Sequence, residues 1–312
     1  MCYSRLDGRI RFDSDPARCY NIGRPHTTHK VIGLKVNANS RSAAINPLAD
    51  RLAIVSDEAA AGFAEAVEIC RPLGIRAFEL RNLPGGRVPH VHPEAIAEVQ
   101  AQVAAHGLRI IGISPGFCKR SLDDPAVETE LATGLDAALS LLDRLRTRRM
   151  TTFSFIRTGC DAPIPPRVLD LLGRAARRCQ AQGVELLIEN SPQCWADTGE
   201  HLAEIATAIG LRVTWDPANA AAAGGEGYPA GYLAVRDRVA HFHAKNWRPG
   251  AGHVYINDGV VDFAGQVAAL QQDGYGGYFC IESHRWSDPT ATETNTRQLL
   301  DLLARPVRFS ET

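Results

Sequence analysis

Four side chains of metal-binding type follow predicted strands at regular intervals along the chain. They are Glu189 in LLIEN, Asp216 in VTWDP, His243 in HFHAK and Glu282 in CIESH, separated by 27, 27 and 39 residues. Three carboxylates that face one another repel strongly unless a cation or protons lie between them. One imidazole with three carboxylates suits Mn²⁺, Mg²⁺, Co²⁺ or Zn²⁺. The pattern therefore predicts one divalent metal site without selecting among these ions, of which we expect Mn²⁺ first.

Each of these residues has a plainer explanation when it is taken singly. A carboxylate after a strand often caps the next helix, and a lone histidine in an apolar strand is often a hydrogen-bonded core residue. In RVAHFHAKNW (238–247), however, His241, His243 and Lys245 occupy alternate positions and so share one face of a strand. Burying three such groups without partners is costly, so we expect that face to hold partners for them.

The elements that must position these residues alternate regularly from about residue 51. Strict alternation of strand and helix implies parallel strands, and eight units favour a closed (β/α)₈ TIM barrel over an open doubly wound sheet. No Gly-x-Gly-x-x-Gly follows the first strand, which weakens the dinucleotide-binding alternative. The predicted strands are 51–56, 75–83, 108–114, 150–157, 184–190, 211–217, 238–247 and 277–284. The predicted helices are 57–74, 92–107, 124–145, 165–183, 197–210, 230–238, 261–275 and 292–305.

Active sites of such barrels lie where the strands end. The four residues above come from the fifth to the eighth predicted strands, so we expect them at equivalent height on one quadrant of the barrel mouth. Residues 49–312 are expected to form this single barrel domain. Residues 1–48 are rich in Arg, Asn, Ser and Asp without a sustained period, which predicts a loosely ordered N-terminal extension. An ordered arm that covers a neighbour is the alternative.

The composition excludes some classes of function. A formal net charge of −1 indicates no broad attraction to nucleic acid or to an anionic membrane. No apolar run approaches the roughly 20 residues of a membrane span, and MCYSRLDGRIRF lacks the apolar stretch of a signal peptide. The eight cysteines are scattered without CxxC spacing, which is typical of reduced thiols. These features favour a cytoplasmic protein.

About residues 51–305 resemble the xylose isomerase-like TIM barrels, which include sugar phosphate isomerases and epimerases, tagatose epimerases, inosose dehydratases and endonuclease IV. The resemblance rests on ELLIEN, TWDPAN, VAHFHAKN, DGVVDF and GYGGYFCIESH. It implies that Glu189, Asp216, His243 and Glu282 are the metal ligands, since the second His of HxHxK is the usual ligand in this family. His241 would then support the site from one layer deeper.

The chain departs from members of that family at several places. Asn246 stands where HxHxKD has Asp, and Asn219 lies where many epimerases place a His after the Asp of the sixth strand. The nuclease members need extra His ligands at the ends of the second and third strands. Those ends are FELRNL and GISPG here, without His, which argues against a nuclease.

The predicted chemistry is the isomerisation or epimerisation of a sugar or a sugar-like hydroxy-ketone. A metal that holds two adjacent oxygens acidifies the carbon-bound proton and stabilises an enediolate. Glu189 and Glu282 would flank the substrate as the acid/base pair as well as ligands. The alternative is a metal-dependent lyase or dehydratase on a keto-sugar or keto-inositol, which uses the same enolate to expel a substituent. A third possibility is a catalytically inert barrel, which the intact ligand set argues against.

Six further polar residues are expected to bind the substrate. Arg157 and Lys245 lie where strands open into the mouth, and Lys119 follows GFC in a loop. Glu79 and Arg81 alternate in the second strand, with a buried ion pair between Glu79 and an arginine as the alternative. Asn219 follows the sixth strand. The expected partner is a small carbohydrate, and homo-oligomers are common among proteins of this kind.

Overall fold

The computed structural model describes residues 5–6, 9–10, 48–159 and 162–306. Contacts divide the chain into two units, Met1–Ala44 and Ile45–Thr312. In the first unit, β1 (Arg5–Leu6) and β2 (Arg9–Ile10) pair antiparallel. The rest of the predicted extension lies outside the described residues, so its loose order and its boundary at residue 48 stay predictions.

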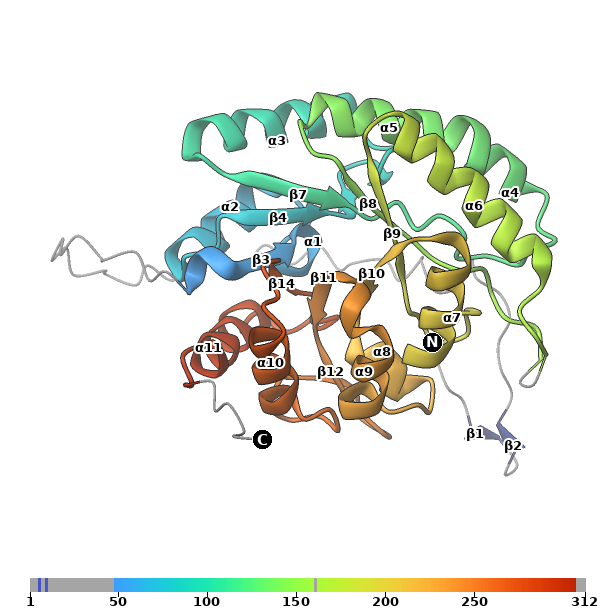
Figure 1. Cartoon of the computed structure of the whole chain (residues 1–312). Helices are drawn as coiled ribbons and strands as arrows, with labels where there is room; N and C mark the ends of the chain where they lie inside the picture. The colour runs from blue at the N-terminus through green and yellow to red at the C-terminus, as the bar shows by residue number, and fades with distance from the viewer. Residues whose placement is uncertain (1–4, 7–8, 11–47, 160–161, 307–312) are drawn as a thin grey trace, which may run out of the picture. The chain divides into compact units, whose positions relative to one another are not determined.

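Eight parallel strands of the second unit close into a barrel, and this confirms the predicted TIM barrel (Figure 1). Their order around the barrel follows the chain, as eight successive βα units require. The strands are β3 (Leu52–Val55), β4 (Ala77–Leu80), β7 (Arg109–Ile113), β8 (Arg149–Thr152), β9 (Glu185–Glu189), β10 (Arg212–Trp215), β11 (Val239–Ala244) and β14 (Phe279–Ile281).

Helices cover the outside of the barrel and end where the sequence signals predict. Gly107 and Gly210, both with positive φ, terminate α3 and α7, and Thr198 caps the start of α7 through the backbone N–H of His201. The helices of at least eight residues are α2 (Phe63–Cys70), α3 (Pro93–His106), α5 (Leu135–Arg144), α6 (Pro166–Ala181), α7 (Gly199–Ile209), α10 (Phe263–Gln272) and α11 (Ala291–Leu303). Among the described residues, every helix is too short or too polar to cross a bilayer.

The structure divides several segments that the sequence predicts as single elements. The predicted helix 57–74 becomes α1 (Ser56–Ala59) and α2, separated by a bend that ends at Gly62. The predicted helix 124–145 becomes α4 (Ala126–Thr129), a π-helical segment (Glu130–Gly134) and α5. The predicted helix 230–238 becomes α9 (Tyr232–Val235) with irregular turns on either side. The apolar period predicts where a helix lies, but it does not predict where that helix is interrupted.

Three short elements near the strand ends were not predicted. The end of the predicted strand 75–83 forms a hairpin, β5 (Asn82–Leu83) with β6 (Gly86–Arg87). A second hairpin pairs β12 (Asn246–Arg248) with β13 (Gly252–Val254). Helix α8 (Pro217–Ala222) starts directly at Asp216, which caps it. All three follow barrel strands, so they build the mouth rather than the barrel wall.

The inside of the barrel holds both apolar and polar side chains. A small buried cluster of Ala53, Val55, Ala77 and Cys280 fills part of it. Thr151 and Thr214 share a hydrogen bond of 3.0 Å across the interior. Because inward positions alternate along a strand, the inward residue that follows Thr214 is Asp216, one of the charged residues described below.

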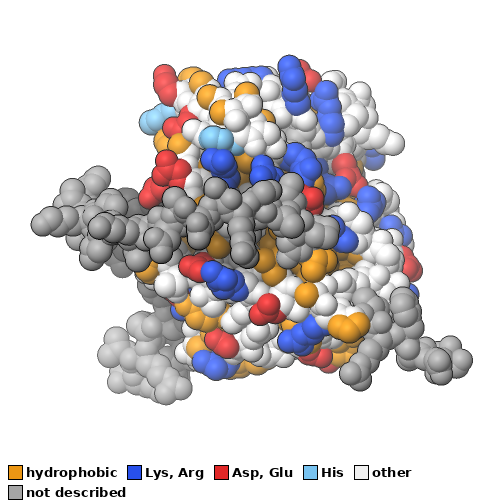
Figure 2. All heavy atoms as spheres, turned by 90° about the vertical axis from the view of Figure 1, so that its left-hand side faces the viewer, with side chains coloured by type: hydrophobic (Ala, Val, Ile, Leu, Met, Phe, Trp, Pro, Cys, Tyr) orange, Lys and Arg blue, Asp and Glu red, His pale blue; other side chains and the backbone are white. Residues whose placement is uncertain are grey.

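The end of the barrel at which the strands start, here called the base, carries arginines (Figure 2). A cavity of about 600 Å³ opens there, lined among others by Arg149, Arg212, Arg236 and Asp273. These arginines are already paired: Arg149 and Arg212 bind Glu185 at 2.9 and 3.0 Å, and Arg236 binds Asp273 at 2.8 Å. Each of these three arginines thus has a carboxylate partner, and Arg149 and Arg212 share one.

Candidate metal centre

The four predicted metal ligands come together at the other end of the barrel, the mouth. One donor atom from each of Glu189, Asp216, His243 and Glu282 lies within 4.8 Å of the others, and all four residues are buried. Glu189 ends β9, Asp216 follows β10, His243 lies in β11 and Glu282 follows β14. The strands are tilted, so residues that share a layer step forward along successive strands. This tilt brings the four side chains into one group.

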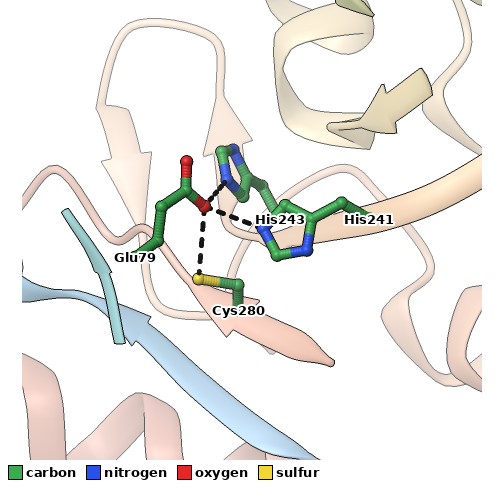
Figure 3. A group of neighbouring side chains, drawn as sticks. All are labelled: Glu79, His241, His243 and Cys280. Atoms are coloured by element: carbon green, nitrogen blue, oxygen red, sulfur yellow. Dashed lines mark hydrogen bonds and ion pairs between the residues drawn. The ribbon is translucent and has the colours of Figure 1, made fainter. Parts of the chain in front are cut away.

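His243 is oriented by a carboxylate that lies one layer deeper (Figure 3). Its Nε2 donates to Glu79 Oε2 at 3.0 Å, and His241 Nε2 donates to the same oxygen at 2.8 Å. The Cys280 thiol lies 3.8 Å from that oxygen. Glu79 thereby fixes the proton of His243 on Nε2 and turns Nδ1 toward the mouth. A histidine held this way by a carboxylate is a common arrangement behind metal ligands.

The Nδ1 atom of His243 shows that the site fits a cation. It is buried and lies 3.4 Å from Glu189 Oε1 and 3.4 Å from Glu282 Oε2. A lone pair that faces two carboxylates is repelled, so the arrangement needs either a proton on Nδ1 or a metal ion between these atoms. Nitrogen and carboxylate oxygens are donors that divalent transition metals accept.

Electrostatics favour the proton when no metal is bound. Burial opposes a charged imidazole, but the carboxylates of Glu282, Glu189 and Glu79 raise the pKa of His243 well above its ordinary value. Burial would likewise raise the pKa of Glu79, but His243 and His241 hold it well below the usual range. A divalent ion that bound here would displace the proton from His243, so its affinity would decrease as the pH is lowered.

Lys245 lies inside the carboxylate group instead of extending outward. Its Nζ is 2.7 Å from Asp216 Oδ2 and 2.8 Å from Glu282 Oε2, and the residue is 1 % exposed. Burial raises the pKa of Asp216 to about 6, although the Lys245 charge opposes this. The ammonium thus neutralises two carboxylates that a metal would also bind, so metal and Lys245 share them. Contact of Lys245 with a substrate stays a prediction.

Arg81 also belongs to this network, through contacts that the sequence analysis missed. Its guanidinium binds Asp57 at 3.0 Å, Glu58 at 2.5 Å and Glu282 at 2.6 Å. Glu79 pairs with His241 and His243, so the alternative of a buried ion pair between Glu79 and an arginine is wrong. The acidic pair Asp57–Glu58 directly after the first predicted strand was the available signal for this part of the mouth.

Asn219 holds two of the predicted ligands. Its backbone N–H donates to Asp216 Oδ1 at 3.0 Å, as the cap of α8, and its Nδ2 donates to Glu189 Oε1 at 3.3 Å. The remaining carboxylate oxygens are thereby turned toward the shared centre. The predicted contact of Asn219 with substrate is untested, but its orienting contacts are direct.

The last two predicted substrate residues differ in their surroundings. Arg157 turns toward the loop after β9, where it lies 3.4 Å from Asp197 and over the Trp195 ring. Lys119, in the loop after β7, places its ammonium 4.2 Å from the centre of the Phe153 ring. Arg157 is thus part of a loop-to-loop ion pair, whereas Lys119 is an exposed residue of the loop after β7, at the mouth of the barrel.

Comparisons with known proteins place this geometry in a family. The family model described as xylose isomerase-like TIM barrel matches residues 67–305. A search of the curated proteins finds no significant match.

Solved structures with this fold are similar over most of the chain. The IOLI protein with a bound zinc atom matches with a TM-score of 0.67 at 14 % identity, over 81 % of this chain and 98 % of that one. The probable 3-DHS dehydratase AsbF from Bacillus anthracis matches with a TM-score of 0.65 at 15 % identity, over 82 % and 99 %. L-ribulose 3-epimerase matches with a TM-score of 0.63 at 18 % identity, over 81 % and 94 %.

Proposed function

This chain belongs to the family of xylose isomerase-like TIM barrels, and from that premise we propose that it is a divalent-metal-dependent isomerase or epimerase of a sugar or a sugar-like hydroxy-ketone. The observation that carries the proposal is the buried group of Glu189, Asp216, His243 and Glu282 with one donor atom each within 4.8 Å. The proposed substrate is a small carbohydrate, and the proposed compartment is the cytoplasm.

Glu189, Asp216, His243 and Glu282 would hold one divalent ion, Mn²⁺ by preference, with Mg²⁺, Co²⁺ or Zn²⁺ as alternatives. When bound, the ion supplies Lewis acidity toward the oxygens of the substrate. The same fold carries zinc in the IOLI protein and magnesium in a Mycobacterium smegmatis barrel, which supports a divalent ion without selecting one.

The two proposed acid/base residues are not equivalent. Both oxygens of Glu282 accept from cations, Arg81 at 2.6 Å and Lys245 at 2.8 Å, and despite burial these and the nearby histidines hold its pKa well below the usual range. The nearest hydrogen bond to Glu189 is the 3.3 Å contact from Asn219. Glu189 is therefore the better base for the proton next to the substrate carbonyl. Glu282 would return a proton only where a substrate draws Lys245 or Arg81 away from it.

A lyase or dehydratase is the second candidate, and the likeness to a probable dehydratase favours keeping it. The first step, abstraction of the carbon-bound proton by Glu189, is the same. The reactions part afterwards: an isomerase returns a proton to carbon, whereas a dehydratase breaks a carbon–oxygen bond and releases water.

The test combines metal content with isotope exchange. Purified protein is stripped with chelator, reloaded with Mn²⁺, analysed for metal per chain and incubated in D₂O with a panel of ketoses and keto-inositols. About one ion per chain, with deuterium in a rearranged product, supports the isomerase. Loss of water supports the dehydratase. A chain that binds no divalent ion after reconstitution overturns both.

A further inference from the structure

Four side chains, here called the interior group, meet inside the barrel below the mouth. Glu79 comes from β4, His241 and His243 come from β11, and Cys280 comes from β14 (Figure 3). One donor atom of each lies within 4.8 Å of the others, and no member of the group is more than 2 % exposed. Carboxylate, imidazole and thiolate are the donors that Zn²⁺ takes in proteins, four of them in a closed structural site.

The donor atoms of the interior group converge on one point. Three of them surround Oε2 of Glu79: Nε2 of His241 at 2.8 Å, Nε2 of His243 at 3.0 Å and Sγ of Cys280 at 3.8 Å. In a tetrahedral zinc site, ligand bonds of about 2.0 to 2.3 Å separate the donors by about 3.3 to 3.8 Å. The imidazoles therefore need to move from the carboxylate by only about half an ångström to admit the ion.

Hydrogen bonds satisfy the two oxygens of Glu79 unevenly. Oε2 accepts from three neighbours, whereas Oε1 is buried and has no partner among the described residues. A buried polar atom without a partner is uncommon, because it loses its hydration without replacement. A metal ion can take both oxygens of one carboxylate, so an ion in the interior group would supply the contact that Oε1 lacks.

The charges of the interior group match a divalent ion. Glu79 and the thiolate of Cys280 supply two negative charges, and the two imidazoles bind an ion as neutral ligands. The bound group is then neutral, which is what a site closed off from water requires. The four mouth ligands include three carboxylates and no sulfur. Thiolate favours Zn²⁺, whereas carboxylate oxygens suit Mn²⁺ and Mg²⁺, so the two groups select different ions.

His243 belongs to both groups through different ring nitrogens. Its Nδ1 lies 3.4 Å from Glu189 and from Glu282 in the mouth, and its Nε2 lies 3.0 Å from Glu79 in the interior group. A neutral imidazole carries one proton, so only one of its nitrogens is free to bind an ion. An ion on Nε2 leaves the proton on Nδ1, facing the two mouth carboxylates. Binding at either group therefore opposes binding at the other.

We propose that the interior group is a second metal site, distinct from the mouth centre, and that it takes Zn²⁺. The thiolate of Cys280 is the ligand that sets its preference for this ion. Because the site is made by side chains of the barrel interior, it does not depend on the reaction proposed for the mouth.

The test uses Co²⁺ as a spectroscopic substitute for Zn²⁺. The full-length protein is treated with chelator and titrated with Co²⁺ under reducing conditions, and the near-ultraviolet charge-transfer band of a cobalt-bound thiolate is recorded. We expect the band in the wild type, its displacement by Zn²⁺ and its complete loss in Cys280→Ala. Cys179→Ala, which changes a buried cysteine of α6, should keep the band.

Mn²⁺ tests whether the two groups exclude one another. Excess Mn²⁺ should diminish the cobalt–thiolate band of the wild type, because an ion at the mouth occupies His243. Glu189→Gln, which lacks one of the proposed mouth ligands, should keep its band when Mn²⁺ is added. Mn²⁺ that binds to the wild type without diminishing the band would show that the groups are independent, and would remove His243 from one of them.

The proposal of an interior site is overturned if the wild type shows no cobalt–thiolate band, or if Cys280→Ala keeps it. Thermal unfolding confirms that Cys280→Ala is folded. X-ray absorption by the zinc-loaded wild type requires no variant and should show a sulfur ligand at about 2.3 Å, and a spectrum without sulfur would equally overturn the site. Failure of Mn²⁺ to bind would overturn the proposed function alone, because the cobalt band is measured without it.

Discussion

The mouth and the base of this barrel are built from the same kinds of residues and use them differently. At the base, arginines and carboxylates form small groups of ion pairs at the surface, such as Arg236 with Asp273 and Glu185 with Arg149 and Arg212. At the mouth, carboxylates, imidazoles and two cations are buried together, and Arg81 alone binds three carboxylates. Surface pairs contribute little to stability, whereas buried charges are costly unless each is matched. The mouth therefore keeps an arrangement that stability alone would not select.

The backbone shows the same difference. Among the described residues, five that are not glycine have positive φ, and four of them lie in loops at the mouth: Cys118 after β7, Phe155 after β8, Gln193 after β9 and His284 after β14. The fifth, Arg146, lies at the base between α5 and β8. Backbone strain of this kind concentrates at functional sites, where the surrounding structure enforces it. Side chains and backbone thus indicate the same end of the barrel as the site.

The largest effect is expected for Glu189, and Glu185 in the same strand β9 provides the matched control. Glu189→Gln, at the mouth end of β9, should abolish stoichiometric metal binding and lower turnover of any substrate found by about a thousandfold. Glu185→Gln, at the base end of the same strand, removes only surface pairs with Arg149 and Arg212 and should preserve both. Elemental analysis and steady-state kinetics measure the two effects. Equal metal content in the two variants would remove Glu189 from the ligand set.

Lys245→Met should reveal the cost of unmatched buried charge. Without the ammonium, the buried Asp216 loses its lysine partner and Glu282 loses one of its cationic partners, so the metal-free variant should lose about 3–5 kcal/mol of unfolding free energy. Mn²⁺ should then raise its melting temperature more than it raises that of the wild type, because the ion takes over the role of the lysine. Calorimetric melting with and without Mn²⁺ is the measurement. An equal or smaller metal-induced rise would mean that metal and lysine do not share these carboxylates.

Glu79→Gln should weaken the metal site without contacting the metal. The amide holds the two histidines less firmly, so Mn²⁺ affinity should fall about 10- to 100-fold. Cys280→Ala, which alters the neighbour of the same carboxylate, should change affinity little. Competitive titration against a metal indicator gives both values. Unchanged affinity in Glu79→Gln would show that His243 does not depend on this carboxylate.

A smaller effect is expected from His253, at the mouth in β13. Burial, assisted by the Lys245 charge, lowers its pKa from 6.5 to about 4. Between pH 4 and pH 6.5 the unfolded chain therefore binds a proton at His253 more readily than the folded protein does. The free energy of unfolding should decrease as the pH falls from about 6.5 to about 4, and His253 should have no effect on it above pH 6.5. His253→Gln should lose less stability than the wild type over that window in denaturant titrations. Parallel curves for the two proteins would contradict the shift.

The smallest effect should come from the base. Arg236→Met removes a surface pair with Asp273, so the unfolding free energy should change by less than about 1 kcal/mol, and less still at high salt. Metal content should stay unchanged. A loss as large as that of Lys245→Met would mean that the two ends of the barrel are not energetically distinct.

The fold and the four side chains that gather at the mouth could be predicted from local signals. Strand–helix alternation indicated the closed barrel, and the structure confirms it. The ends of helices were predicted less accurately where a single bend decides them. One example is the bend that ends at Gly62 and divides the predicted helix 57–74. The hairpins after β4 and β11 were missed because their two- and three-residue strands are too short for a period to be recognised.

By itself, the sequence determined which residues alternate along each strand, and therefore which side chains point into the barrel, because that period depends only on the local backbone. It also placed Glu189, Asp216, His243 and Glu282 at strand ends. Only the tertiary structure decided their partners: His241 and Glu79 are 162 positions apart, and Arg81 and Glu282 are 201 apart. Such contacts depend on closure and strand tilt, which set the layer that each inward side chain joins. This is why Lys245 lies among the carboxylates.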